Sequence, residues 1–323
     1  MKLRLLSGPD IAAALPLLEA IDAMRGAFAA LSAGRAVVPQ RSLLPTPEGF
    51  SLFMPAFVPG AALGGKIVSV FPKNAARGKP VVTGLVVLLD PESGEPCALL
   101  DGTFLTAWRT GAATGLATDL LARKDARRGA LLGCGAQGRT QVLAMDAVRR
   151  LETIRLHSRS PESVRKLCEE MQGSLRARLV PAADGRAAVE GADIVSIATN
   201  SASPVVLGEW LEAGAHVNGI GSFTVEMREV DSALVARSRV FVDSRQAALA
   251  EAGDLVVPLR EGATREVDWT ELGEVVLDPS RGRRTETEVT FFKSVGLAVQ
   301  DMAAAERACA SAKASGRGRE IEF

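Results

Sequence analysis

The chain has 323 residues, of which 47% are hydrophobic and 24% are charged. This length suits two domains, and the composition is that of an ordinary globular protein, which excludes a disordered chain, a collagen-like repeat and a coiled coil. Lysine plus arginine and aspartate plus glutamate both number 38, so the formal net charge is zero, which argues against a general nucleic-acid binder.

The four cysteines are widely spaced and form neither a CxxC pair nor a cluster with histidine. This spacing favours reduced thiols over a disulfide framework or a zinc site, and we expect no bound metal. The first ten residues, MKLRLLSGPD, lack the long apolar region of a signal peptide, and the longest uncharged stretch (49–65) is interrupted by prolines and glycines. We therefore expect a cytoplasmic protein that does not enter a membrane.

The hydrophobic pattern of the first third predicts helices and then a sheet. Residues 9–33 repeat apolar side chains at helical spacing and predict one or two helices. Short apolar runs between residues 37 and 100, separated by proline and glycine, predict a strand meander, in which PESGEP (91–96) forms a hairpin connection. A further helix is predicted to begin at residues 101–103 and to end at residue 121.

After residue 128, strands and helices are predicted to alternate. The apolar runs predict strands at 130–132, 153–158, 192–199, 215–220 and 240–243, and helices at 137–149 and 161–171. This alternation is typical of an α/β protein with a doubly wound parallel sheet. The tail is predicted to be helical from residue 293 to 314 and to end in a frayed segment, SGRGRE (315–320).

A glycine-rich motif joins the strand at 130–132 to the helix that follows it. GALLGCGAQGRTQ places Gly133, Gly135 and Gly138 in a GxGxxG spacing. The first glycine permits a tight turn, the second leaves room for a pyrophosphate, and the third lets helix and strand pack closely. We predict that these glycines, with Ala136 and Gln137 between them, bind a dinucleotide at the helix N-terminus.

The end of the next strand indicates which dinucleotide binds. A carboxylate that accepts a hydrogen bond from the ribose 2′-hydroxyl is typical of NAD-binding domains. This chain instead has Ser158, Arg159 and Ser160, which offer hydroxyls and a guanidinium to a 2′-phosphate. These residues favour NADP, with NAD as the alternative, and the less favoured interpretation of Arg159 is a solvated loop arginine.

Three cations of the first half stand beside apolar runs or small residues: Arg41 in VPQRSLL, Lys66 in GGKIVSVFP and Arg109 in LTAWRTGAATG. The helix that carries Arg109 is otherwise lined by threonine, alanine and glycine, which allow a backbone or a ligand to approach closely. A guanidinium pairs with a carboxylate through two N–H groups, and a lysine adds a point charge. The three residues therefore suit the carboxylate of an amino acid.

With these motifs in place the chain resembles a known family. The order of GGK, LTAWRTGAA, GCGAQ, NGIGS, EAGDL and FKSVG is similar to that of the ornithine cyclodeaminase and mu-crystallin family, over about residues 41–301. The resemblance implies a Rossmann domain (119–299) and a smaller α+β substrate-binding and dimerisation domain (1–118 and 300–323). It also implies a homodimer and nicotinamide chemistry on amino acids or cyclic imines.

The resemblance also implies roles for single residues. Arg41, Lys66 and Arg109 would hold the substrate carboxylate, Lys66 also serving catalysis, and Thr83 would line the same pocket. Asp231 matches the acid/base carboxylate of the family, although from the sequence alone it would be interpreted as a helix cap. The residues expected near the nicotinamide are Thr199, Asn218, Val295 and Gly296; Thr83 and Asn218 can also be ordinary strand and turn residues.

The reaction implied is hydride transfer between NADP and the α-carbon of an amino acid or a cyclic imine, such as pyrroline- or piperideine-2-carboxylate. Leu52, in SLFMP, stands where relatives acting on ornithine are expected to carry an acidic residue for the distal amine. This substitution favours an imine reductase over the alternative, an ornithine cyclodeaminase. A non-enzymatic NADP-dependent binding protein is a third hypothesis, and the presence of Arg41, Lys66, Arg109 and Asp231 argues against it.

Overall fold

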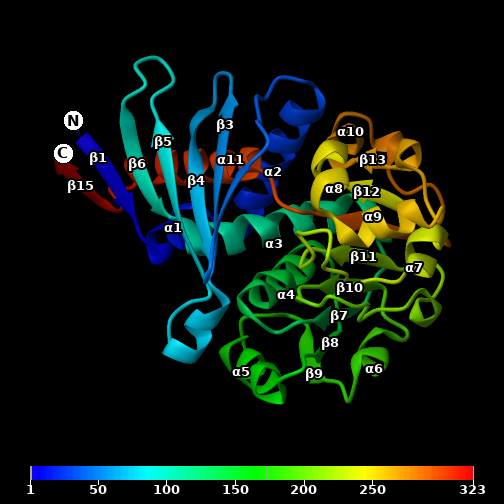
Figure 1. Ribbon diagram of the computed structural model, residues 1–323. Coiled ribbons are helices and arrows are strands. Elements are labelled where there is room, and N and C mark those ends of the chain that lie inside the picture. The colour runs from blue at the N-terminus through cyan, green and yellow to red at the C-terminus, as the bar shows by residue number, and fades with distance from the viewer. Residues whose placement is uncertain (1, 172, 323) are drawn as a thin grey trace. The chain divides into compact units, whose positions relative to one another are not determined.

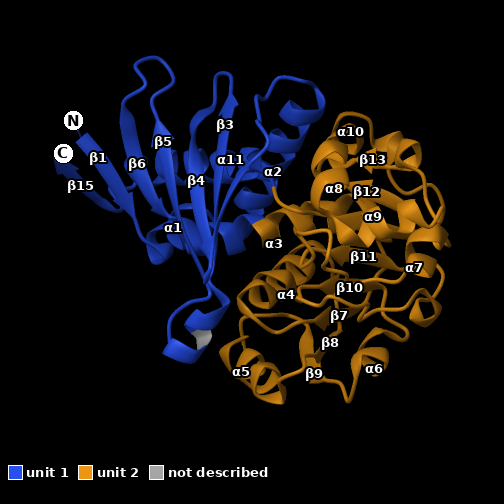
Figure 2. Cartoon of the chain, viewed as in Figure 1, with its two compact units in different colours: residues 1–109, 297–323 blue, residues 110–296 orange. Residues whose placement is uncertain are grey.

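The computed structural model describes residues 2–171 and 173–322, apart from the side chain of residue 75. The chain divides into two compact units (Figure 2). Unit 1 comprises residues 1–109 and 297–323, and unit 2 comprises residues 110–296. Helix α3 (Gly102–Leu121) supplies residues to both. Across the described residues, every helix falls short of the length or the hydropathy that a bilayer-spanning helix requires.

Unit 1 is built on a seven-stranded mixed sheet with the order β15-β1-β6-β5-β4-β3-β2 (Figure 1). Strands β2 to β6 form an antiparallel meander, β1 runs parallel to β6, and β15 is antiparallel to β1. The strands are β1 (Lys2–Leu6), β2 (Ser42–Thr46), β3 (Gly49–Val58), β4 (Ala62–Val70), β5 (Val82–Leu89), β6 (Pro96–Asp101) and β15 (Arg319–Glu322). The helices are α1 (Gly8–Ala14), α2 (Leu17–Ser32) and α11 (Ala298–Ala314), with a 3₁₀ turn at Pro72–Arg77.

The two faces of the unit 1 sheet differ in burial. Helix α11 packs against β3, β4 and β5, and side chains alternate along a strand, so every second residue lies on the face under this helix. Met54, Lys66 and Val86 are paired across these three strands and are all buried. The residues between them point to the opposite face, where large apolar side chains remain exposed.

Unit 2 is a sheet of eight strands, each paired in parallel with its neighbours, in the order β13-β12-β14-β11-β10-β7-β8-β9. The strands are β7 (Arg128–Leu132), β8 (Thr153–His157), β9 (Arg178–Pro181), β10 (Ile194–Ile197), β11 (His216–Gly219), β12 (Ser238–Val242), β13 (Thr270–Glu271) and β14 (Val289–Lys293). Their first five members follow the 3-2-1-4-5 order of a Rossmann fold, which confirms the predicted fold class. The order reverses between β7 and β10, and ligands of such sheets bind at the carboxyl ends of the strands beside this point.

Short helices connect the strands of unit 2. They are α4 (Ala136–Val148), α5 (Pro161–Met171), α6 (Gly185–Val189), α7 (Ser232–Arg237), α8 (Arg245–Glu251), α9 (Gly253–Arg260) and α10 (Leu272–Leu277). Single 3₁₀ turns lie at Gly208–Trp210, Glu266–Asp268 and Pro279–Arg281.

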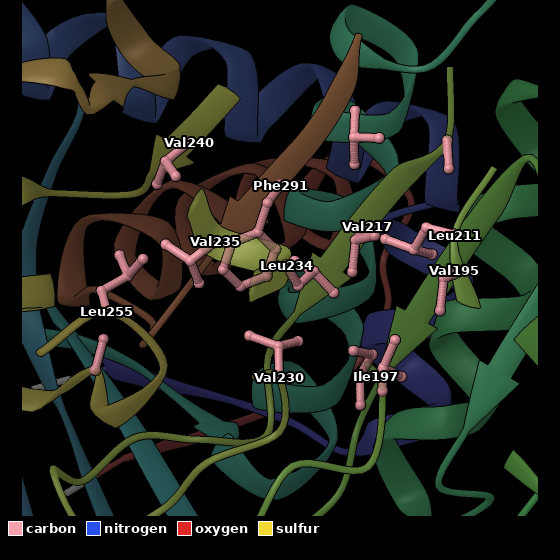
Figure 3. Packing of buried hydrophobic residues seen from close by; sticks show 14 of the residues in the cluster. Val195, Ile197, Leu211, Val217, Val230, Leu234, Val235, Val240, Leu255 and Phe291 are labelled. Carbon is pink, nitrogen blue, oxygen red and sulfur yellow. The ribbon is translucent and has the colours of Figure 1, made fainter. Parts of the chain in front are cut away.

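Hydrophobic cores cover both faces of the unit 2 sheet. Alternate residues of β7 divide between them, with Ala130 and Leu132 in one core and Leu131 in the other. The larger core continues through Val195 and Val217 of the neighbouring strands (Figure 3). Because both faces are covered, the central strands β7, β10, β11 and β14 are buried along nearly their whole length, and β7 and β10 are visible in the sequence as short hydrophobic runs.

The structure also corrects the sequence predictions near the ends of the chain. The tail helix begins at Ala298 rather than at residue 293, because residues 289–293 form β14, a fully buried strand that its own short apolar run did not indicate. The frayed segment was predicted over residues 315–320, but Arg319 and the following residues form β15 by pairing with β1. Edge pairing between the two ends of a chain leaves no local signal in the sequence.

Candidate active site

The GxGxxG loop lies between β7 and α4, as the motif predicts. Gly133 adopts a φ of +99°, and a Cβ there would collide with the carbonyl oxygen of Ala198. A Cβ on Gly138 would collide with the carbonyl of Gly133, so helix and strand do pack closely here. Gly135 is the N-cap of α4 and has no side chain to bond the N–H groups of the first turn. No heavy atom other than those of its chain neighbours lies within 4 Å of the position that a Cβ would take. The loop therefore presents backbone N–H groups at a helix N-terminus, with room for an anion.

The loop after β8 carries the residues predicted to choose between NAD and NADP. An Arg159 guanidinium nitrogen donates a hydrogen bond of 2.9 Å to Oδ1 of Asn200, in the loop after β10. Ser160 Oγ accepts a 3.3 Å bond from the backbone of Ser163 at the start of α5. Arg159 thus joins two loops at the carboxyl edge of the sheet, next to the point where the strand order reverses.

A buried glutamate organises the other loops at this edge. Oε1 of Glu229 accepts hydrogen bonds from the backbone N–H and the hydroxyl of Thr199, at 2.7 and 2.8 Å. Oε2 accepts from the backbone N–H groups of Gly221 and Ser222, at 2.7 and 3.2 Å. Thr199 follows β10, and the other two residues follow β11. One carboxylate therefore fixes the loop of Thr199, which the resemblance assigns to the cofactor, together with the loop after β11.

A buried ion pair, Asp254 with Lys293, lies beside Glu229. Oδ1 of Asp254 accepts from the backbone N–H groups of Glu229 and Val230, and Oδ2 pairs with Nζ of Lys293 at 3.0 Å. All three ionisable side chains are fully buried. Burial raises the pKa of Glu229 to about 7; the positive charge of Lys293 opposes this rise and the negative charge of Asp254 adds to it.

The segment after β14 is held by another buried carboxylate. Oδ2 of Asp243 accepts hydrogen bonds from the backbone N–H groups of Val295 and Gly296, both at 2.8 Å, and from the hydroxyl of Ser294. Asp243 directly follows β12. Val295 and Gly296, which the resemblance assigns to the nicotinamide region, are thus fixed at the carboxyl edge of the sheet with Thr199.

Asn218 is placed differently from its prediction. It lies within β11, fully buried, where its amide nitrogen donates to Thr118 Oγ1 at 3.0 Å and its oxygen contacts Nε2 of His216 at 3.1 Å. Burial lowers the pKa of His216 to about 3, so its imidazole is neutral at physiological pH. These contacts give Asn218 a structural role inside unit 2, and its cofactor role stays a prediction without a contact to support it.

In unit 1 the structure brings together the predicted substrate cations. Nζ of Lys66, on β4, lies 2.7 Å from Oδ2 of Asp301, and Nε of Arg109 donates to Oδ1 of the same carboxylate at 2.9 Å. Another Arg109 nitrogen donates to Oε1 of Gln300 at 2.7 Å. All four side chains are buried, and Asp301 and Gln300 both come from the first turn of α11.

The electrostatics of this cluster act on Lys66. Burial lowers the pKa of Lys66 to about 8, the attraction of Asp301 opposes this shift, and the positive charges of Arg109 and Arg41 add to it. Arg41, just before β2, is therefore close enough for its charge to act on Lys66. The structure joins Lys66 and Arg109 through Asp301, and the substrate-binding role of Arg41, Lys66 and Arg109 stays a prediction.

Thr83 does not join the cluster. It pairs with Ser69, the third residue after Lys66 on β4, and therefore lies on the opposite face of the sheet. Leu52, in contrast, is on the cluster's face and buried, since it pairs with Val68 next to Met54 and Lys66. An uncharged side chain thus occupies the position at which an acidic residue would serve a distal ammonium.

Asp231 is the N-cap of helix α7. Its Oδ1 accepts a 3.0 Å bond from the backbone N–H of Leu234 and a 2.9 Å bond from that of Gly208. The carboxylate therefore starts one helix and fixes a neighbouring turn. This is the structural interpretation that the sequence alone offered, and the acid/base role stays a prediction.

Comparison with known proteins agrees with these motifs. The model of the ornithine cyclodeaminase/mu-crystallin family matches residues 3–316. The chain belongs to this family. Among curated members, a Delta(1)-pyrroline-2-carboxylate reductase of Bacillus cereus is 39% identical over 307 residues, which cover 92% of this chain and 94% of the relative.

Two solved structures of family members superimpose on the whole chain. Thermococcus litoralis Delta(1)-pyrroline-2-carboxylate reductase, in complex with NADH and L-proline, matches with a TM-score of 0.95 and 38% identity, covering 98% of this chain and 100% of that one. An archaeal alanine dehydrogenase dimer with bound NAD matches with a TM-score of 0.93 and 30% identity over the full length of both chains. The predicted family and the predicted combination of a Rossmann domain with a second α+β domain are confirmed.

The buried carboxylates were not predicted from the sequence. Asp301 organises the candidate substrate region of unit 1, and Glu229 and Asp254 organise loops at the carboxyl edge of the unit 2 sheet; none was predicted to do so. A signal exists for Asp301, because it stands in AVQDMAAA, a stretch that is apolar on both sides. A lone charge inside such a run is buried more often than a charge in a mixed surface helix, and it then requires a partner.

Proposed function

We propose that this protein is an NAD(P)H-dependent reductase that converts a cyclic imine carboxylate, Delta(1)-pyrroline-2-carboxylate, to L-proline. The observation that carries the proposal is the buried group of Lys66, Arg109 and Asp301 in a chain that is 38% identical, over 98% of its length, to a reductase solved with NADH and L-proline. The assignment of an oxidoreductase acting on an imine agrees with the hypothesis that the sequence favours.

Unit 2 fits a nicotinamide dinucleotide. The open N-cap at Gly135 and the close approach at Gly138 suit a pyrophosphate, which the backbone N–H groups of residues 135–138 would hold. The loops of Thr199 and of Val295–Gly296 are the proposed supports of the nicotinamide ring. When bound, the reduced nicotinamide supplies the hydride for imine reduction.

The finer choice of cofactor rests on the loop after β8. It carries Ser158, Arg159 and Ser160 and no carboxylate, so a 2′-phosphate would meet a guanidinium and no repulsive charge. We therefore propose that NADPH is preferred and that NADH is also accepted, since solved relatives bind NADH or NAD. In the structure Arg159 is already held at this edge by Asn200.

Unit 1 is the proposed substrate-binding domain. Arg109 and Arg41 would hold the carboxylate of the imine, because a guanidinium pairs with both carboxylate oxygens. Lys66 would give a proton to the ring nitrogen, which gains one when the imine carbon gains a hydride. With a pKa of about 8, the ammonium is mostly protonated at neutral pH and yet is a stronger acid than an ordinary lysine.

Reduction is favoured over cyclodeamination by Leu52. A diamine substrate would need a partner for its distal ammonium, and this position on the cluster's face carries a buried aliphatic side chain. The imine ring has no distal charge, so an apolar neighbour suits it. A purely binding protein would have no use for a buried lysine whose pKa is lowered beside an arginine and a carboxylate.

We also propose a cytoplasmic homodimer that assembles through unit 1. The outer face of its sheet exposes Phe53, Ile67 and Leu85, which are paired across three neighbouring strands, at 40, 42 and 45% of their surface. A contiguous exposed apolar row is typical of an interaction surface. The described cysteines are free, which is compatible with a reducing compartment.

The proposal is tested by steady-state kinetics on the purified protein. We expect consumption of NADPH with Delta(1)-pyrroline-2-carboxylate, formation of proline, and a lower kcat/KM with NADH. A parallel incubation with ornithine and catalytic NAD is expected to release no ammonia. Ammonia and proline from ornithine without net cofactor consumption would establish the cyclodeaminase instead, and inertness in both assays would favour a binding protein.

A further inference from the structure

Gln300 lies in the candidate substrate region of unit 1, and its amide nitrogen has no hydrogen-bond partner among the described residues. The residue is fully buried on α11. Its Oε1 accepts a 2.7 Å hydrogen bond from Arg109, and a longer one of 3.4 Å from the backbone N–H of Leu297. The amide nitrogen, Nε2, is itself buried.

The orientation of the amide is fixed by chemistry. A guanidinium has only donors, so the atom of Gln300 that faces Arg109 must be the acceptor, Oε1. Nε2, with two N–H donors, must then point elsewhere. Buried donors without an acceptor are rare in native proteins because each loses its bonds to water, so this nitrogen requires an acceptor other than the described residues.

The charges around Gln300 indicate what that acceptor is. Lys66 and Arg109 each carry one positive charge, Asp301 carries one negative charge, and Gln300 is neutral. The cluster therefore keeps one net positive charge, and the nearby charge of Arg41 adds to it. An anionic group with more than one acceptor oxygen would satisfy both the charge and the open N–H, and a carboxylate has this chemistry.

We propose that Gln300 is a substrate-binding residue that donates a hydrogen bond from Nε2 to the carboxylate of the imine. This proposal rests on the proposed function, which supplies the carboxylate ligand. While Nε2 of Gln300 donates to the substrate, its Oε1 holds Arg109 in place, and the neutral amide preserves the positive charge of the cluster. The residue thereby selects for carboxylates, a role that a glutamate of nearly the same shape would not fill.

The substitution Gln300→Glu separates this role from a structural one. Glutamate keeps an acceptor for Arg109, removes the N–H donor and adds a negative charge. If Gln300 only positioned Arg109, L-proline would lose only the affinity that the added negative charge removes, and Gln300→Met, which adds no charge, therefore tests the N–H donor separately. We expect instead that the dissociation constant of L-proline, measured by calorimetry with NADP⁺ present, rises by about tenfold to a hundredfold. We expect KM for the imine to rise in parallel, with a smaller change in kcat.

Two controls complete the experiment. L-prolinamide, which lacks the carboxylate, should bind wild type and Gln300→Glu with similar affinity. Gln246→Glu places the same charge on an exposed residue of α8 and should leave proline binding unchanged. Gln300→Met, which is uncharged and similar in length, tests the donor if the glutamate variant does not fold, and we expect about tenfold weaker binding of L-proline.

The outcomes distinguish this inference from the proposed function. Equal affinity of wild type and Gln300→Glu for L-proline, with the imine still reduced by both, would overturn the role of Gln300 and leave the reductase intact. A wild-type protein that neither binds L-proline nor reduces the imine would overturn the proposed function itself.

Discussion

Burial brings the pKa of Lys66 down to about 8, a value at which an ammonium releases its proton far more readily than an exposed lysine does. If Lys66 protonates the ring nitrogen, kcat for imine reduction should be constant below pH 8 and fall about tenfold per pH unit above it. Lys66→Arg keeps the positive charge, but arginine is a much weaker acid than lysine. We therefore expect kcat to fall by about a hundredfold or more, while the affinity for proline changes less than tenfold. Wild-type turnover that does not fall up to pH 10 would remove Lys66 from proton transfer.

Glu229 makes a prediction about stability and pH. Its pKa in the folded protein, about 7, lies above its ordinary value of 4.5, so between these values the folded state holds a proton that the unfolded state has released. The contribution of this group to stability is therefore complete below pH 4.5 and is lost as pH rises through 7. The free energy of unfolding of the wild type should fall relative to that of Glu229→Gln between pH 5 and pH 8, by an amount on the order of 3 kcal/mol. Urea titrations at the two pH values measure this, and a constant difference would contradict it.

Among single residues, the sequence identified the cations of the candidate site more readily than its buried carboxylates. Lys66 and Arg109 could be singled out because each stands in a run of apolar or small residues and because guanidinium and ammonium groups suit a carboxylate ligand. Asp301 could not be assigned, because its bond to Arg109 joins residues 192 positions apart. The apolar stretch around Asp301 indicates that the carboxylate is buried, but only tertiary packing identifies the cation with which it pairs.

Among the elements, α3 depends on its small residues. A Cβ added at Gly111 would lie 2.6 Å from Cβ and 2.8 Å from the carbonyl oxygen of Thr140 on α4, so Gly111→Ala must push the two helices apart. We expect a loss of about 1 to 3 kcal/mol, despite the better helix propensity of alanine. Gly26, in the middle of α2, has nothing within 4 Å of its Cβ position, and Gly26→Ala should stabilise the protein by up to about 1 kcal/mol. Two changes of the same sign in thermal unfolding would refute this account of α3.

Helix α7 tests the two interpretations of Asp231. Both hydrogen bonds that the structure gives this carboxylate are bonds to backbone N–H groups, and asparagine caps helices equally well. We expect Asp231→Asn to keep turnover within several-fold and stability within about 0.5 kcal/mol, and Asp231→Ala to lose about 1 kcal/mol. A loss of turnover in Asp231→Asn at an unchanged melting temperature would support the acid/base role instead.

The elements themselves were predictable where burial is regular. Strands β7 and β10 of unit 2 are largely apolar because both sheet faces are covered, and the helix at Gly102–Leu121 begins and ends where the helical spacing of its sequence predicts. Strand β14 was not predicted, although Val289–Lys293 is fully buried, because the run is short and carries a lysine whose partner, Asp254, lies far away in sequence. Strand β15 pairs with β1, which is distant in sequence, and no turn signal connects the two strands.

At the scale of the whole molecule, the outer sheet face of unit 1 predicts the assembly. Ile67 lies in the middle of the exposed row between Phe53 and Leu85, so Ile67→Lys should place a charge in the dimer interface and yield a monomer. Size-exclusion chromatography with light scattering measures this. Val267→Lys, at a residue of unit 2 that is 82% exposed, is the matched control and should remain a dimer. If wild type and Ile67→Lys have the same mass, the interface lies elsewhere.

The central claim is that the protein reduces the carbon–nitrogen double bond of a cyclic imine with hydride from a nicotinamide. The most direct measurement uses NADPH that carries two deuterium atoms at C4 of the nicotinamide, with unlabelled Delta(1)-pyrroline-2-carboxylate as the acceptor. Mass spectrometry and NMR of the product should show L-proline with one deuterium, at the α-carbon. Proline without deuterium at this carbon, or cofactor oxidised without proline, would contradict the account.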